Sequence, residues 1–190
     1  EGKVYGRQMT NLSMIEILRP IAYELFREKG DAFNSKRLKV AIDSAELQGP
    51  YSGGKALYSY ELIVPENKAD SLYHFMLADL NKYSGYSATI EKIPTDCLIL
   101  IRTSETDKLQ SKGGPSLNTF PKPISVLCNS PINYMLARIN EVFRGDELII
   151  DETGYAGNVD IEIRGTTDLT VLKKELSRYD LDIVRARRDL

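Results

Sequence analysis

Residues 147–163 read Glu-Leu-Ile-Ile-Asp-Glu-Thr-Gly-Tyr-Ala-Gly-Asn-Val-Asp-Ile-Glu-Ile, and this stretch decides the expected fold of the chain. The apolar run 147–151 and the alternating run 158–163 are both typical of β-strands. Gly154 and Gly157 lie between the two runs and predict a tight connection with positive backbone φ angles. The stretch therefore predicts two strands joined by a glycine turn.

Helical periodicity appears on both sides of this stretch. Apolar residues at helical spacing predict a helix that begins with Pro131 at its first position and ends before Gly145. A second helix is expected over 168–179, and a last strand over 181–186. The C-terminal part of the chain therefore alternates helices and strands.

The N-terminal part predicts the same order of elements. A helix over 12–28 could be capped by Asn11 or by Ser13, with Glu16 in the capping-box position after Ser13, and Pro20 should kink or restart it. The other expected elements are a strand at 38–43, a strand at 57–64, a helix at 70–83, and a hairpin with arms at 87–93 and 97–102.

Short sequence matches connect the two parts in the same order. They pair residues 25–27 with 142–144, 40–43 with 148–151, 60–63 with 161–163, and 79–83 with 175–179. We therefore expect an α+β fold of two related units, each with two helices on a small mixed or antiparallel sheet, produced by an internal duplication. The polar, Gly- and Pro-rich segment 105–123 is the expected linker between units 1–104 and 124–190.

The polar residues of the glycine turn have two interpretations. The side chains of Asp151 and Thr153 can bond neighbouring backbone amides, as in turns that form without a ligand. Alternatively, the acidic residues Asp43, Asp151, Glu152 and Asp160 could gather around a cation, although their spacing matches no calcium loop. We favour the structural role, and no metal site or cofactor is expected.

The two cysteines, Cys97 and Cys128, match no zinc or redox motif in their spacing. Cys97 opens an apolar strand, so a buried thiol is the simplest expectation. A disulfide between the two cysteines is the alternative, and an oxidising compartment would permit it.

Tyrosine is common and tryptophan is absent, with 11 and 0 residues. Tyr51, Tyr58 and Tyr60 cluster near an expected edge strand, where tyrosines suit contact with a partner as well as ordinary sheet packing. His74 is the only histidine. It lies in an expected helix without distinctive polar neighbours, so no catalytic residue is predicted.

Charge and hydropathy narrow the classes of partner. The chain has 25 Lys and Arg residues against 27 Asp and Glu residues, which argues against nucleic-acid binding because that needs a concentrated basic face. No apolar run approaches the roughly 20 residues of a membrane span. The expected partner is therefore a protein or a small ligand.

The glycine-turn segment and the elements after it resemble an uncharacterised bacterial family, domain of unknown function 3738, also described as soil-associated. The family hallmark resembles V-D-x-T-G-L-x-G-x-Y-D, then a helix, then L-G-L-x-L. This chain keeps five hallmark residues: Asp151, Thr153, Gly154, Gly157 and Asp160.

The chain also departs from that pattern. It has Tyr155 and Val159 at aromatic or aliphatic positions, and residues 180–182 replace the usual Gly-Leu. Residues 58–61 and 112–115 resemble the N-terminal part of the family more loosely.

The resemblance implies an extracytoplasmic location and, in some members, fusion to thioredoxin-like domains. It implies no activity and no catalytic residue. The chain begins at Glu1 without a methionine, so we expect a removed leader or a larger parent protein.

These observations favour a non-enzymatic binding or interaction module, exported and joined to other domains, that recruits a partner by extending a sheet or holds a ligand between its two units. A redox accessory that acts through Cys97 and Cys128 beside a thioredoxin-like domain is the alternative. A hydrolase has the least support because the sequence offers no pair of nucleophile and base. The sequence alone does not identify the ligand.

Overall fold

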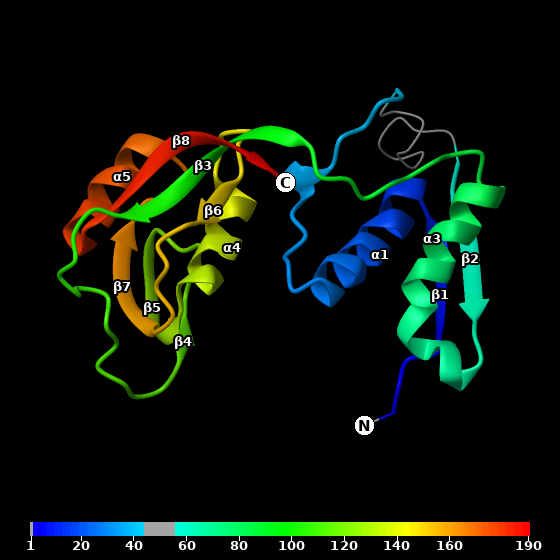
Figure 1. The fold of residues 1–190 in the computed structure, drawn as a ribbon, viewed down its shortest axis with the longest axis horizontal. Helices are drawn as coiled ribbons and strands as arrows, with labels where there is room; N and C mark the ends of the chain where they lie inside the picture. Colours follow the sequence, from blue (N-terminus) through cyan, green and yellow to red (C-terminus); the bar gives the residue numbers. More distant parts are fainter. Residues whose placement is uncertain (1, 44–55) are drawn as a thin grey trace. The chain divides into compact units, whose positions relative to one another are not determined.

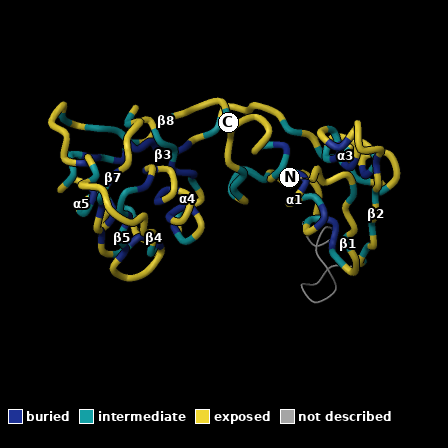
Figure 2. Tube along the Cα trace, turned by 90° about the horizontal axis from the view of Figure 1, so that it is seen from below, coloured by how far each residue is buried: buried dark blue, intermediate teal, exposed yellow. Residues whose placement is uncertain are grey.

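The computed structural model describes residues 2–43 and 56–190 and divides the chain into two compact units, residues 1–91 and 92–190. The expected α+β class is confirmed, with four α-helices and three small sheets in the described residues (Figure 1). Each unit has its own cluster of buried apolar side chains, and Figure 2 shows buried residues along the chain of both units.

The first unit packs two helices against a two-stranded sheet. Strands β1 (Gly6–Leu12) and β2 (Tyr58–Ile63) pair antiparallel, and helices α1 (Met14–Glu28) and α3 (Leu72–Tyr83) contact each other. The buried apolar residues of this core are Ile17, Ile21, Leu25, Val64, Leu72, Met76 and Leu80.

Helix α1 begins where the sequence predicts. The carboxylate of Glu16 accepts a hydrogen bond from the Ser13 amide at 2.8 Å, as a capping box requires, and a second one from the Ser13 hydroxyl at 2.6 Å. Met14, Ile17 and the other buried positions recur at helical spacing. The helix continues through Pro20 without restarting.

The second unit contains two sheets. In the first, β3 (Pro94–Arg102) lies between β6 (Ile149–Asp151), which runs parallel to it, and β8 (Leu181–Asp189), which runs antiparallel. The ladder between β3 and β8 runs from Pro94 opposite Asp189 to Arg102 opposite Leu181.

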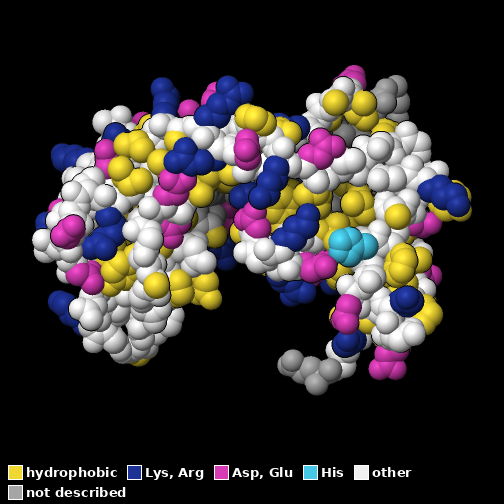
Figure 3. All heavy atoms as spheres, in the orientation of Figure 1, with side chains coloured by type: hydrophobic (Ala, Val, Ile, Leu, Met, Phe, Trp, Pro, Cys, Tyr) yellow, Lys and Arg dark blue, Asp and Glu magenta, His cyan; other side chains and the backbone are white. Residues whose placement is uncertain are grey.

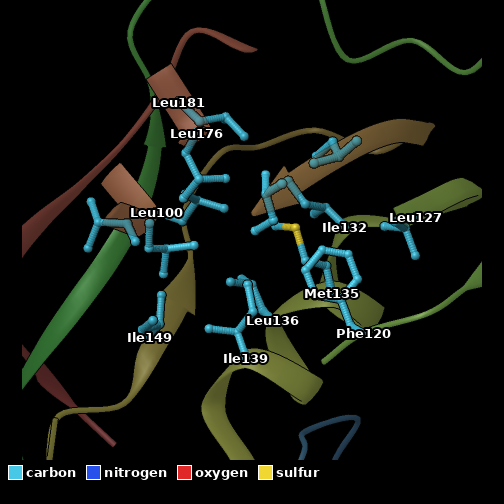
Figure 4. Close-up of a cluster of buried hydrophobic side chains, with 14 of the residues drawn as sticks. Leu100, Phe120, Leu127, Ile132, Met135, Leu136, Ile139, Ile149, Leu176 and Leu181 are labelled. Atoms are coloured by element: carbon cyan, nitrogen blue, oxygen red, sulfur yellow. The ribbon is translucent and has the colours of Figure 1, made fainter. Parts of the chain in front are cut away.

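The other sheet of this unit has the order β4 (Leu117–Asn118), β5 (Ile124–Pro131), β7 (Asn158–Arg164). Helices α4 (Ile132–Val142) and α5 (Leu169–Leu176) pack beside it, and their apolar sides meet those of both sheets in one core (Figure 4). Three short 3-10 helices complete the described elements of the chain: Ser35–Arg37, Glu66–Ser71 and Ser177–Tyr179.

The antiparallel pairs β1–β2 and β5–β7 share a β-bulge at the same place. Between the pairs Met9–Tyr60 and Leu12–Tyr58, two residues of β1 lie opposite one residue of β2. Likewise Leu127 to Ser130 in β5 spans Ile161 to Val159 in β7. Each bulge contains an asparagine with positive φ, Asn11 at 55° and Asn129 at 42°. A helix begins three residues after each asparagine.

Two expected strands of the N-terminal part are wrong. Residues 38–43 form no strand, and Val40 and Ile42 in that segment are exposed. Residues 87–93 form no hairpin arm. The apolar strand β3 instead pairs with β8 and β6, because its apolar residues fit the core of the second unit.

The boundary between the units also differs from the expected one. Residues 92–104 belong to the second unit, and the segment 105–123, expected as a linker, lies inside that unit. Leu109 and Phe120 are buried in its core, and 117–118 forms β4. The Gly and Pro residues of this segment therefore shape a packed loop. Pro131 ends β5 and caps α4 instead of occupying its first turn.

Candidate functional site

The glycine turn expected from the sequence follows β6 and is held by its own side chains. The Asp151 Oδ1 atom accepts hydrogen bonds from the Thr153 amide at 2.9 Å and from the Thr153 hydroxyl at 2.7 Å. The Thr153 Oγ1 atom in turn accepts a bond from the Tyr155 amide at 3.2 Å. Gly154 has a φ of 64°, in the left-handed region that favours glycine. These bonds form the turn predicted from Asp151 and Thr153, but the strands that it joins, β6 and β7, belong to different sheets and do not pair with each other.

Tyr155 extends the turn to the loop before β4. Its hydroxyl donates to the Asp107 carboxylate at 3.1 Å, and the Arg102 guanidinium lies 5.7 Å from the centre of its ring. Asp107 also accepts bonds from the amides of Leu109 and Gln110, both at 3.0 Å. Gly157 lacks the positive φ expected for it; instead, a Cβ atom at this position would lie 3.0 Å from the Tyr155 ring.

Asp160 joins the same loop to the β5 bulge. Its two carboxylate oxygens accept hydrogen bonds from the amides of Asn129, at 2.9 Å, and Lys112, at 2.8 Å. These bonds, with one from Ser111, hold the pKa of Asp160 below its usual range. Asp160 thus remains ionised at neutral pH and fixes two backbone segments that are far apart in sequence.

The arrangement is a structural network and does not resemble a cation site. The carboxylates of Asp151, Asp160 and Asp107 are occupied by N–H and O–H donors, whereas a hard cation would need free oxygens. Glu152 instead pairs with Arg188 at 2.6 Å, which lowers the pKa of Glu152. No group of three or more metal-ligating side chains occurs in residues 2–43 and 56–190.

The cysteines do not form the disulfide considered as an alternative. Both are free, Cys97 on β3 and Cys128 on β5, which belong to different sheets. Burial raises the pKa of the Cys97 thiol, and its sulfur lies 3.5 Å from the Ala186 carbonyl oxygen. A buried thiol with a raised pKa is a poor nucleophile and a slow redox partner.

The tyrosines expected at a partner surface face the core instead. Tyr58 and Tyr60 pack against the core of the first unit, and the exposed residues of β2 are Ser59, Glu61 and Ile63. Burial and the neighbouring Asp79 carboxylate raise the pKa of Tyr60. Tyr51 lies outside the described residues.

His74 has one polar partner. Its Nε2 atom lies 2.8 Å from the Glu28 carboxylate, and both side chains are about half exposed. This pair bridges α3 and α1 at the surface. Neither a cysteine nor a hydroxyl nucleophile contacts this histidine among the described residues, so the pair supports no catalytic arrangement.

A groove between β2 and α3 is the concave feature that the sequence did not predict. It has a volume of about 440 Å³ and is lined by Leu62, Ile63, Val64, Pro65, Lys68, Phe75, Ala78, Asp79, Lys82 and Tyr83. Two apolar side chains of α3 in this lining are exposed, Phe75 by 43% and Tyr83 by 71%. Figure 3 shows hydrophobic side chains at the surface over α3. Such a cluster on a small unit is typical of a contact surface.

The β2 strand presents an open edge beside this groove. The Val64 amide donates to the Tyr5 carbonyl at 2.8 Å, on the side of β1. Because alternate residues of an antiparallel ladder point their N–H and C=O groups in opposite directions, Glu61 and Ile63 point theirs away from β1. No strand in the described part of the chain pairs with that edge.

One sequence signal bears on this groove. Phe75 recurs at helical spacing with Leu72 and Met76, and this spacing predicts a buried position for all three. In the structure Leu72 and Met76 are buried, whereas Phe75 lies at the border of the buried stripe and is exposed to solvent. An aromatic residue at the border of a helical stripe was therefore the available hint.

The described helices include none that is both long and apolar enough to cross a lipid bilayer.

Comparison with known proteins assigns the chain to no family. No protein-family model matches the sequence, and neither a curated protein nor a solved structure matches it.

Proposed function

We propose that this protein is a non-enzymatic interaction module whose first unit binds a polypeptide partner in the groove between β2 and α3. The observation that carries this proposal is the coincidence of an open strand edge with exposed apolar side chains in one groove. An extended peptide can use both, because the edge supplies backbone hydrogen bonds and the apolar wall supplies specificity.

The alternative of a redox accessory finds little support. It depended on Cys97 and Cys128 as a working pair. The burial of Cys97, its raised pKa and the separation of the two cysteines on different sheets all weigh against that role. The extracytoplasmic location, the family membership and the fusion to a thioredoxin-like domain stay predictions from the sequence resemblance.

We also propose that the two units descend from one duplicated β-α-β-α element. The identical bulges of β1–β2 and β5–β7 and the equal placement of α1 and α4 support this proposal. In this alignment Tyr60 corresponds to Ile161 and Glu61 to Glu162. The second unit carries additional strands, so any ancestral element has been extended there.

Selection from a random dodecapeptide library against the immobilised full chain tests the interaction proposal. Selected peptides would be measured by fluorescence anisotropy with wild-type protein and with Phe75→Ala and Tyr83→Ser. Both residues are exposed, so these changes should leave the fold intact. We expect roughly tenfold or greater weakening, as for the loss of a buried contact at an interface.

Tyr134→Ser is the matched control, because Tyr134 is a helical tyrosine on α4 with 54% exposure and lies outside the groove. It should bind like the wild type. The proposal fails when no peptide is selected, or when the groove variants bind every selected peptide as tightly as the control.

A further inference from the structure

The second unit closes the strand edge that corresponds to the open edge of β2. Along the first half of β7, the loop before β4 runs antiparallel to the strand. The Asp160 amide donates to the Leu109 carbonyl at 3.1 Å, and the Ser111 amide donates to the Asn158 carbonyl at 3.0 Å. An extended segment of the chain therefore occupies this edge.

Side chains from the following helical segment close the second half of the same edge. The Tyr179 hydroxyl accepts a bond from the Glu162 amide at 2.8 Å and donates to the Glu162 carbonyl at 3.1 Å. The Glu175 carboxylate accepts a bond from the Arg164 amide at 3.1 Å. The outward backbone groups of β7 thus have partners along the strand.

The corresponding side chains of the first unit leave its edge open. The sequence match of 79–83 with 175–179 places Asp79 at the position of Glu175 and Tyr83 at that of Tyr179. Asp79 lies beside the Tyr60 hydroxyl instead of the strand edge, and Tyr83 is 71% exposed beside Lys82. Both residues line the groove, where they form a wall along the edge without covering it.

We infer that an extended segment of a partner protein adds to β2 as a third, antiparallel strand, in the place that the chain itself fills along β7. This inference rests on the proposed function and specifies its binding mode. The backbone groups of Glu61 and Ile63 receive the new strand, and its side chains on the helical side contact Phe75 and Tyr83.

The charge of the edge specifies the chemistry of the occupant. Glu61 is exposed at the centre of the open edge and corresponds to Glu162. A Lys or Arg on the incoming strand would pair with Glu61 across the ladder, which favours binding. A second copy of this chain, paired symmetrically about Glu61, would place Glu61 opposite Glu61, and such like-charge pairs disfavour strand association. The occupant is therefore a partner segment with a basic residue flanked by apolar ones.

Backbone methylation of the selected peptides tests the binding mode. Two versions of one peptide carry N-methyl groups on alternate residues, in opposite registers. In a strand addition only one register directs its amides at β2. Methylation in that register should weaken binding by about ten- to a hundredfold, whereas the other register should bind like the parent peptide.

A charge exchange provides the second measurement. Glu61→Lys should weaken binding of a peptide with a central lysine, and a Lys-to-Glu peptide should recover it. Glu162→Lys is the matched control on the closed edge of β7 and should leave binding unchanged.

The outcomes separate the two proposals. Equal binding by both methylated registers, with binding still lost in Phe75→Ala, would overturn strand addition and leave the groove as a binding site. Binding that is indifferent to Phe75 and Tyr83 would overturn both proposals. Sedimentation that shows a dimer disrupted by Phe75→Ala would identify a second copy as the occupant and overturn the partner segment.

Discussion

Replacement of Asp160 by asparagine should destabilise the second unit although the side chain keeps its shape. The carboxylate accepts amide hydrogen bonds from Asn129 and Lys112, one at each oxygen. An asparagine offers one carbonyl oxygen, and its NH₂ group would face the other amide. The loss of one charge-assisted hydrogen bond at this half-buried side chain costs about 2 kcal/mol.

Urea denaturation followed by circular dichroism would measure this loss. With a slope of about 2 kcal/mol per M, the transition midpoint should fall by about 1 M. Asp189→Asn is the matched control, because the exposed Asp189 carboxylate makes no hydrogen bond or ion pair in the described part of the chain. Its effect should stay within about 0.5 kcal/mol.

The pH dependence of the same variant gives an independent check. Because the folded state lowers the pKa of Asp160, its stabilising contribution is complete above the ordinary aspartate pKa of about 4. That contribution is lost as the pH falls through the lowered folded-state pKa. The stability gap between wild type and Asp160→Asn should therefore close in acid. A gap that is absent at pH 7, or that persists unchanged in strong acid, would refute the structural role of Asp160.

Three further outcomes follow from the packing of single residues. Gly154→Ala should cost about 1–2 kcal/mol in urea denaturation, because its φ of 64° strains any residue with a Cβ; an unchanged midpoint would contradict the turn geometry. Joint replacement of Tyr58 and Tyr60 by serine should destabilise the first unit by about 2 kcal/mol or more, because both rings pack on its core. A folded double variant with wild-type stability would contradict the packing of these tyrosines on the core. Iodoacetamide should label Cys128 before Cys97 in the native protein, measured by mass spectrometry, because Cys97 is buried at 1% exposure; labelling of Cys97 first would contradict its burial.

Local patterns predicted the helices and the glycine turn well. The capping box at Ser13 and the spacing of buried residues place α1 correctly, since both signals are contained within one helix. The Asp151 and Thr153 turn was likewise predicted because its bonds span only a few residues. Elements whose stabilising contacts are local could thus be derived from the sequence.

Strand pairing was less predictable because it depends on distant partners. The apolar strand β3 lies close in sequence to the first unit, yet its hydrogen-bonding partner β8 begins at Leu181. Strand β5 was missed because its apolar alternation is short and lies beside prolines. The prolines and glycines of 105–123 are typical of a linker and of a packed loop alike. The burial of Leu109 and Phe120 shows that this segment is a packed loop.

The candidate groove shows a further limit of sequence patterns. Its residues are ordinary members of a strand and a helix, and what distinguishes them is the absence of a cover. The corresponding edge in the second unit is covered by Tyr179, whereas Tyr83 is exposed. Two similar sequence segments thus differ in what lies beside them, because residues 109–111, Glu175 and Tyr179 close the edge of β7, whereas no described strand pairs with the edge of β2.

The pairing of β3 with β8 has a mechanical consequence. The second unit starts and finishes at one point, where Ile93 and Leu190 exchange backbone hydrogen bonds at 3.0 and 3.1 Å. Tension applied to these two ends would break the hydrogen bonds between β3 and β8 one pair at a time, beginning at this end. It would not stretch all of these bonds at once. The same closeness of the ends would allow the unit to be spliced into a surface loop of another protein without stretching its host.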